Sequence, residues 1–160
     1  MISIIRAPEP VKRPSKSLHV TLWVVQVVLP LFFGMAGVLK TTMPLAELAK
    51  SMAWIRDVPG PLVRFIGTSE IAGALGMLLP SLTRIRPALT PAAAAGLTTI
   101  MILAAALHAT RGELPFVAET LVVGALAAFV AWGRLRRAPI LPRDRQRSHG
   151  AEGRLSVSSS

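Results

Sequence analysis

The sequence VRFIGTSEIAGALGMLLP, residues Val63 to Pro80, decides how the rest of the chain must fold. It is apolar enough to lie in a membrane, yet it carries one carboxylic acid, Glu70, among small residues. On a helix Gly67, Gly73 and Ala74 lie three or four positions from Glu70 and therefore share its face. Small residues let a neighbouring helix approach closely, so we expect Glu70 to point toward another helix and away from lipid.

The composition also indicates a membrane protein. Of the 160 residues 52% are hydrophobic and only 16% are charged, and the mean hydropathy is +0.54. This length suits one domain. The chain contains no cysteine, which excludes disulfides, thiolate metal sites and iron–sulfur clusters built from its own residues. The net charge of +10 lies mainly beside the apolar segments, where it is typical of a membrane orientation signal and does not indicate nucleic-acid binding.

Three further apolar segments accompany the one around Glu70, each close to the roughly 20 residues that cross a bilayer. The four predicted spans are Val20–Leu39, Leu62–Leu79, Ala88–Ala109 and Pro115–Trp132. The alternative for the first is a cleaved signal peptide, but its apolar run exceeds the usual 7–15 residues, so we favour an uncleaved helix. Pro30 should kink it, and Pro80 should end the second span. The predicted fold is therefore an all-α bundle of four transmembrane helices.

The connection between the first two spans has a helical pattern of its own. Leu45, Leu48, Met52 and Ile55 recur at spacings of three or four, and the sequence DVPGP at 57–61 ends the pattern. We predict a short helix lying at the membrane interface, with a plain loop as the alternative.

The distribution of Lys and Arg predicts the orientation. Of the 18 such residues, 13 lie in the N-terminal tail, the 80–87 loop and the C-terminal tail, which four spans place on one side. The positive-inside rule assigns that side to the cytoplasm. We expect a membrane domain at 18–137, with disordered basic cytoplasmic tails at 1–17 and 138–160.

Ionisable residues of the spans gather toward the opposite side, which predicts a polar pocket at that level. The candidates are Lys40, Arg64, Glu70, His108 and Glu119. Glu70 needs either a proton or a cation from another helix, and its glycine- and alanine-lined face favours the neutral acid. For pairing, Lys40 or His108 suits Glu70, and Arg64 suits Glu119. The alternative is a structural network that only fixes helix packing.

Close helix packing is predicted at five small residues of the second and third spans: Gly67, Gly73, Gly76, Ala92 and Gly96.

Other chemistry has little support in the sequence. A metal site from His108, Glu70 and Glu119 ranks below a hydrogen-bonding role. Haem lacks a second histidine within a span, because His19 and His149 lie at or beyond the cytoplasmic edge. No nucleotide loop, Ser-His-Asp arrangement or metalloprotease motif is present, so no catalytic residue is predicted.

Several of these segments resemble DoxX-like membrane proteins. The similar runs are LWVVQV at 22–27, AGVLK at 36–40, MAWIRDVP at 52–59, RFIG at 64–67, EIAGALG at 70–76 and AWGR at 131–134. The resemblance covers about residues 20–134 and implies a four-helix protein of the bacterial cytoplasmic membrane. That family takes its name from a subunit associated with thiosulfate:quinone oxidoreductase, and some relatives are linked to redox-stress complexes.

We therefore expect a small membrane subunit of a redox or quinone-linked system, not an enzyme on its own. Quinone is the candidate cofactor, and the candidate partners are an oxidoreductase subunit, a second copy of the chain and the lipid bilayer. The alternatives are a small-solute or proton-coupled carrier, and a structural partner that recruits soluble proteins.

Overall fold

Four apolar helices, each long enough to cross a membrane, dominate the computed structural model, which describes residues 16–140. They are α1 (Lys16–Thr42), α3 (Gly60–Thr83), α4 (Leu89–Thr110) and α5 (Leu114–Trp132), the last continued by one π-helical turn, η2 (Gly133–Arg137). The predicted all-α bundle of four transmembrane helices is confirmed. Most of the two tails predicted to be disordered lies outside the described residues.

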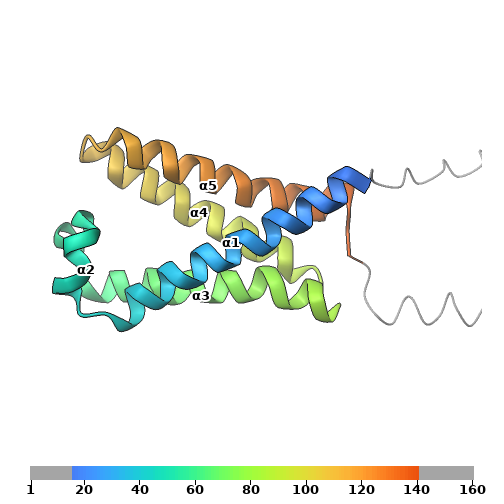
Figure 1. The fold of residues 1–160 in the computed structure, drawn as a ribbon, viewed down its shortest axis with the longest axis horizontal. Coiled ribbons are helices and arrows are strands. Elements are labelled where there is room, and N and C mark those ends of the chain that lie inside the picture. Colours follow the sequence, from blue (N-terminus) through green and yellow to red (C-terminus); the bar gives the residue numbers. More distant parts are fainter. Residues whose placement is uncertain (1–15, 141–160) are drawn as a thin grey trace, which may run out of the picture.

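The helices pack as two pairs joined by a third contact. In Figure 1, α1 crosses α3 at a shallow angle, α5 lies along α4, and α3 packs on α4. Helices α1 and α5 meet only where α1 begins and α5 ends, and they diverge toward the other end of the bundle. We call the end with the α1 N-terminus and η2 the basic end, and the opposite one the α2 end.

The connection at the α2 end is helical in two pieces. α2 (Leu45–Ser51) and the 3-10 turn η1 (Ala53–Asp57) are separated at Met52. Leu48 and Ile55 are buried with Val63 of α3 in a small apolar cluster, whereas Glu47 and Lys50 are exposed. The apolar side of this amphipathic segment therefore packs on α3, which holds the segment across one end of the bundle.

Both long helices that contain an internal proline continue past it. α1 runs through Pro30, and α3 runs through Pro80 to Thr83, so the predicted end of the second span at Leu79 is wrong. A proline removes one backbone donor, a loss that packing against neighbouring helices can offset in a membrane protein. Both prolines are buried against the bundle. Arg84 follows α3 as its C-terminal cap and takes the left-handed conformation with φ 58°.

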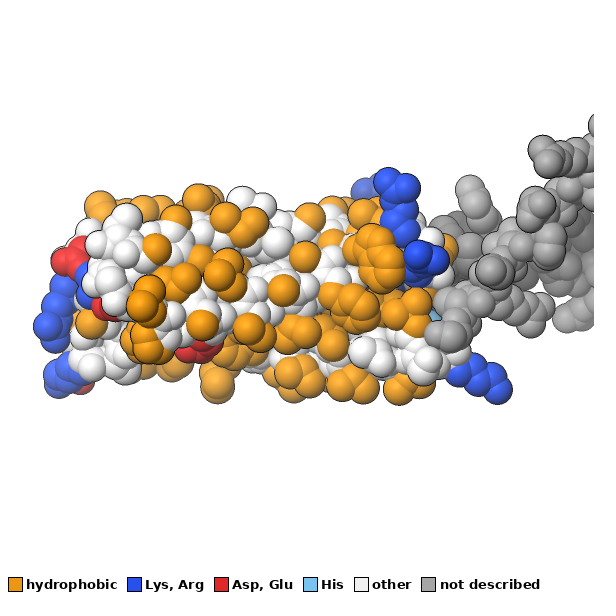
Figure 2. Space-filling model, turned by 90° about the horizontal axis from the view of Figure 1, so that it is seen from above, with side chains coloured by type: hydrophobic (Ala, Val, Ile, Leu, Met, Phe, Trp, Pro, Cys, Tyr) orange, Lys and Arg blue, Asp and Glu red, His pale blue; other side chains and the backbone are white. Residues whose placement is uncertain are grey.

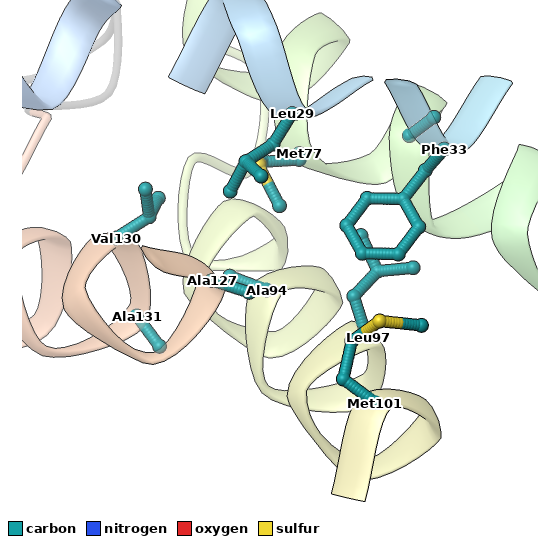
Figure 3. Close-up of a cluster of buried hydrophobic side chains, with 10 residues drawn as sticks. Leu29, Phe33, Met77, Ala94, Leu97, Met101, Ala127, Val130 and Ala131 are labelled. Atoms are coloured by element: carbon teal, nitrogen blue, oxygen red, sulfur yellow. The ribbon is translucent and has the colours of Figure 1, made fainter. Parts of the chain in front are cut away.

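The apolar core lies between the middle of the bundle and the basic end. Phe33 and Leu29 of α1 pack with Met77 of α3, Leu97 of α4 and Val130 of α5 (Figure 3). On the outside, large hydrophobic side chains are exposed along the helices, and charged ones gather near both ends on the face shown in Figure 2. An apolar surface of this kind requires lipid around it.

Two glycines set the spacing between α3 and α4. A Cβ atom added at Gly73 would lie 2.6 Å from Leu97, and one at Gly76 would lie 3.0 Å from the Ala93 Cβ. Both positions therefore let α4 approach α3 closely.

Two other residues predicted for close packing lie on the outside of the bundle. Ala92 and Gly96 lie on the exposed face of α4, and a Cβ at Gly96 would meet no atom within 4 Å. The buried face of α4 is instead set by its larger side chains, Leu97 and Met101, which face the other helices.

Candidate functional site

The centre of the candidate site is a buried ion pair between two helices. Lys40, in the last turn of α1, donates to both carboxylate oxygens of Glu70 in α3, with each Nζ–Oε distance 2.7 Å. The two side chains are 9% and 2% exposed. Of the two partners considered for Glu70, the structure thus selects Lys40, and it supplies the cation that an ionised carboxylate needs at this depth.

The backbone geometry explains why these two side chains meet. A Cβ atom at Gly67, one turn before Glu70, would lie 2.7 Å from the Lys40 Cβ and 2.9 Å from the carbonyl oxygen of Gly37. Only a residue without a side chain allows α1 and α3 to cross so closely at this level. The close approach of Gly67 and Gly37 therefore brings Lys40 directly against Glu70.

Arg64 supports the same crossing, but it does not pair with Glu119 as predicted. Its guanidinium donates to the carbonyl oxygens of Lys40, at 2.6 Å, and Met43, at 2.7 Å. Carbonyl groups in the last turn of a helix lack intrahelical partners and carry partial negative charge, which a cation satisfies. Arg64 thus closes the end of α1 beside the ion pair.

His108 belongs to a second ionic group at the turn between α4 and α5. Its Nδ1 lies 2.6 Å from Glu113 Oε2, and its ring stacks on Phe116 with the ring centroids 5.3 Å apart. Arg111 donates through Nε to the other Glu113 oxygen at 3.0 Å, and it also pairs with Asp57 of η1. His108 therefore bonds Glu113, and the pairing of His108 with Glu70 considered from the sequence is not formed.

Glu113 is a site residue that the sequence reasoning missed, although it lies in the short turn directly after His108. The pKa of its carboxyl group is lowered from the ordinary value, first by the hydrogen bond from Arg111 and then by that from His108. Arg111, which an ionised Glu113 holds within the α4–α5 turn, joins that turn to η1 through its pair with Asp57.

Glu119 stands apart from these pairs. Glu119 is exposed on α5, and among the described residues its carboxylate has no hydrogen-bond or ionic partner. It faces the cavity described next.

Two cavities meet at the ion pair. One, of about 410 Å³, lies between α1 and α5, and the other, of about 380 Å³, lies between α3 and α4. Both are lined by Lys40, Glu70, His108, Met101 and Trp54.

The rims of these cavities reach the lipid-facing surface. Met35 and Phe116 border the first and are 66% and 51% exposed, and Phe65 and Leu103 border the second at 67% and 65%. Mostly apolar walls with a few convergent polar groups are typical of small-molecule sites.

A metal centre does not assemble at this site. Within residues 16–140, no three His, Asp or Glu side chains are grouped closely enough to hold a metal ion. His108 is occupied by Glu113, and Glu70 by Lys40, so the arrangement considered from His108, Glu70 and Glu119 is not formed.

A second buried polar cluster, at the basic end, was not expected. Gln26 of α1 donates to Ser81 at 2.6 Å and to the Met77 carbonyl at 2.9 Å, and it accepts from Arg134 Nε at 2.7 Å. Ser81 also bonds Thr90 of α4 at 2.8 Å. Arg134 is only 3% exposed, so what sequence reasoning took for a flanking charge points into the bundle. This cluster ties all four spans together.

These features define a small multi-pass membrane protein with an ion pair buried between lipid-accessible cavities. The comparisons with known proteins agree with this class. The family model described as the DoxX-like family matches residues 24–130, and the chain belongs to that family. Neither the curated proteins nor the solved structures that were searched gave a match.

Proposed function

We propose that this protein binds the headgroup of a membrane quinone at the Lys40–Glu70 pair. In this proposal it serves as an accessory subunit of a redox system in the bacterial cytoplasmic membrane, with both termini cytoplasmic. The supporting observation is that two cavities with apolar, lipid-facing rims converge on one buried ion pair. A quinone has a small polar ring and a long apolar tail, and it reaches its sites from within the bilayer.

The free hydrogen-bonding capacity of the site suits such a ring. An ammonium group has three donors, and Glu70 accounts for two contacts of Lys40, so one direction is left for a carbonyl oxygen. His108 uses Nδ1 for Glu113, and among the described residues nothing bonds its Nε2. Both side chains line both cavities, and Trp54 and Phe116 provide aromatic surfaces beside them.

The carrier alternative is less well supported by this arrangement. A solute that passed from the ion pair to the basic end would have to cross the packed cluster of Phe33, Met77 and Leu97. Those side chains are at most 1% exposed, so passage would require the core to open. Flux of a solute through vesicles that contain the purified protein would support the carrier over the quinone site.

Fluorescence of Trp54 tests the proposal, because this residue borders both cavities. In a Trp23→Phe/Trp132→Phe background, a short-chain ubiquinone should quench the emission saturably. The double change Lys40→Met/Glu70→Leu removes both charges together and should abolish saturation. Glu47→Gln alters the exposed Glu47–Lys50 pair and serves as the control. Linear quenching of the same slope in all three proteins would show only partition of quinone into the detergent or lipid, and would contradict the proposal.

A further inference from the structure

The carboxylates of the described chain all lie in one half of the bundle, whereas its basic residues lie at both ends. The basic end carries Lys16, Arg84, Arg86, Arg134, Arg136 and Arg137. The five acidic residues within 16–140 all lie between the middle of the bundle and the α2 end: Glu47, Asp57, Glu70, Glu113 and Glu119. Within the described residues the basic end therefore lacks carboxylates that could neutralise its guanidinium groups.

The turn η2 arranges three of these arginines in two directions. Arg134 points inward, where its guanidinium lies 4.9 Å from the Trp23 ring centre. Arg136 and Arg137 are exposed, and the Arg137 guanidinium lies 5.3 Å from the ring centre of Trp132.

A surface hollow lies at the same place. It is shallow and wide open, and it is lined by Trp132, Arg136 and Arg137. Two apolar side chains of this part of the chain, Trp132 and Leu135, are exposed by 45% and 61%. The hollow thus combines two cations and an aromatic ring at the end of the last apolar helix.

We propose that Trp132, Arg136 and Arg137 bind the phosphate of an anionic phospholipid, with an acyl chain lying along α5. Guanidinium groups form charge-assisted, bidentate hydrogen bonds to phosphate oxygens, and tryptophan prefers the headgroup level of a bilayer. Within residues 16–140 no carboxylate forms an ion pair with Arg136 or Arg137. The site is separate from the quinone site, which lies in the other half of the bundle, and it does not depend on that proposal.

Lipid-dependent quenching of Trp132 tests this inference. The protein, in a Trp23→Phe/Trp54→Phe background, is placed in phosphatidylcholine vesicles that contain increasing fractions of brominated phosphatidylglycerol. Brominated phosphatidylglycerol should quench the Trp132 emission more strongly than brominated phosphatidylcholine does at the same fraction. The quenching should also saturate as the fraction of brominated phosphatidylglycerol rises. Changing Arg136→Gln/Arg137→Gln should weaken the apparent affinity by roughly tenfold or more, because hydrogen bonds to charged groups are lost.

The matched control is Lys16→Gln/Arg86→Gln, which removes the same charge from the basic end but leaves the hollow intact. In this control, brominated phosphatidylglycerol should quench the Trp132 emission to the same extent as in the background protein. An equal loss in both double variants would show a general surface-charge effect and overturn the site, as would equal quenching by the two brominated lipids. If the Arg136/Arg137 variant does not fold, competition with added sodium phosphate in the background protein provides a second test. Free phosphate lacks an acyl chain and should not displace the lipid at millimolar concentration, and displacement would overturn a lipid-specific site.

Discussion

Replacing Glu70 with glutamine should destabilise the protein strongly, because it leaves the Lys40 ammonium buried without a counter-charge. The two Nζ–Oε distances of 2.7 Å correspond to a gross attraction of about 6 kcal/mol at an effective dielectric constant of ~20. The cost of taking both ions out of water offsets much of this attraction. Removing one partner of a buried pair nevertheless costs about 3–5 kcal/mol, and we expect a loss of that size for Glu70→Gln.

Reversible unfolding of the purified protein in mixed detergent micelles measures this loss. The double change Lys40→Met/Glu70→Leu should recover most of the stability lost in Glu70→Gln, because neither buried charge is then left alone. Glu119→Gln is the control, since Glu119 is exposed and has no partner within the described chain. A Glu70→Gln variant within about 1 kcal/mol of the wild type would refute the ion pair and would indicate that Glu70 is a neutral acid.

Three further predictions concern orientation, packing and pH. In whole cells an impermeant maleimide should label Ser51→Cys and leave Ser17→Cys unlabelled, because we place the α2 end outside; the opposite pattern would reverse the topology. Gly67→Ala should cost about 1–3 kcal/mol by overpacking, since its Cβ would lie 2.7 Å from the Lys40 Cβ, whereas Gly96→Ala has open space and should be near neutral in the same unfolding assay. The lowered pKa of Glu113 adds stability that is fully present above the ordinary value of 4.5 and is lost as the pH falls through the lower folded value. Unfolding followed from pH 7 to pH 3 should therefore show an acid loss that Glu113→Gln reduces, and an unchanged acid loss in that variant would count against the Arg111–Glu113–His108 group.

The fold and the level of the candidate site could be predicted because both depend on patterns along single helices. Apolar runs of membrane-spanning length predict the four helices whatever their packing. The position of a charged residue along its apolar run gives its depth in the bilayer. This is why Lys40 could be matched in depth with Glu70. The choice between Lys40 and His108 depended on contacts between helices, and it was decided by Glu113, which takes His108.

Rotation of each helix about its own axis was harder to predict. Residues 92–95 are four consecutive alanines followed by Gly96, so several faces of α4 carry the same small-residue pattern. The face that packs on α3 is the one that places Leu97 against Gly73. The burial of Gln26 could have been predicted more easily. This residue lies on the same face of α1 as Leu29, Phe33 and Lys40, and it is fully buried.

The pairing of α1 with α3 also has a consequence for how the chain is synthesised. Lys40 and Glu70 are 30 residues apart, and α2 and η1 lie between them. At ~5–20 residues per second, about 1.5–6 s pass between the translation of the lysine and that of its partner. The first helix therefore reaches the bilayer ahead of the second, and the place of Lys40 in the last turn lets its flexible stem reach the headgroups, where the ammonium group stays hydrated. The position of the lysine at the end of its helix therefore lets the first span enter the membrane alone and become locked only when the next helix arrives.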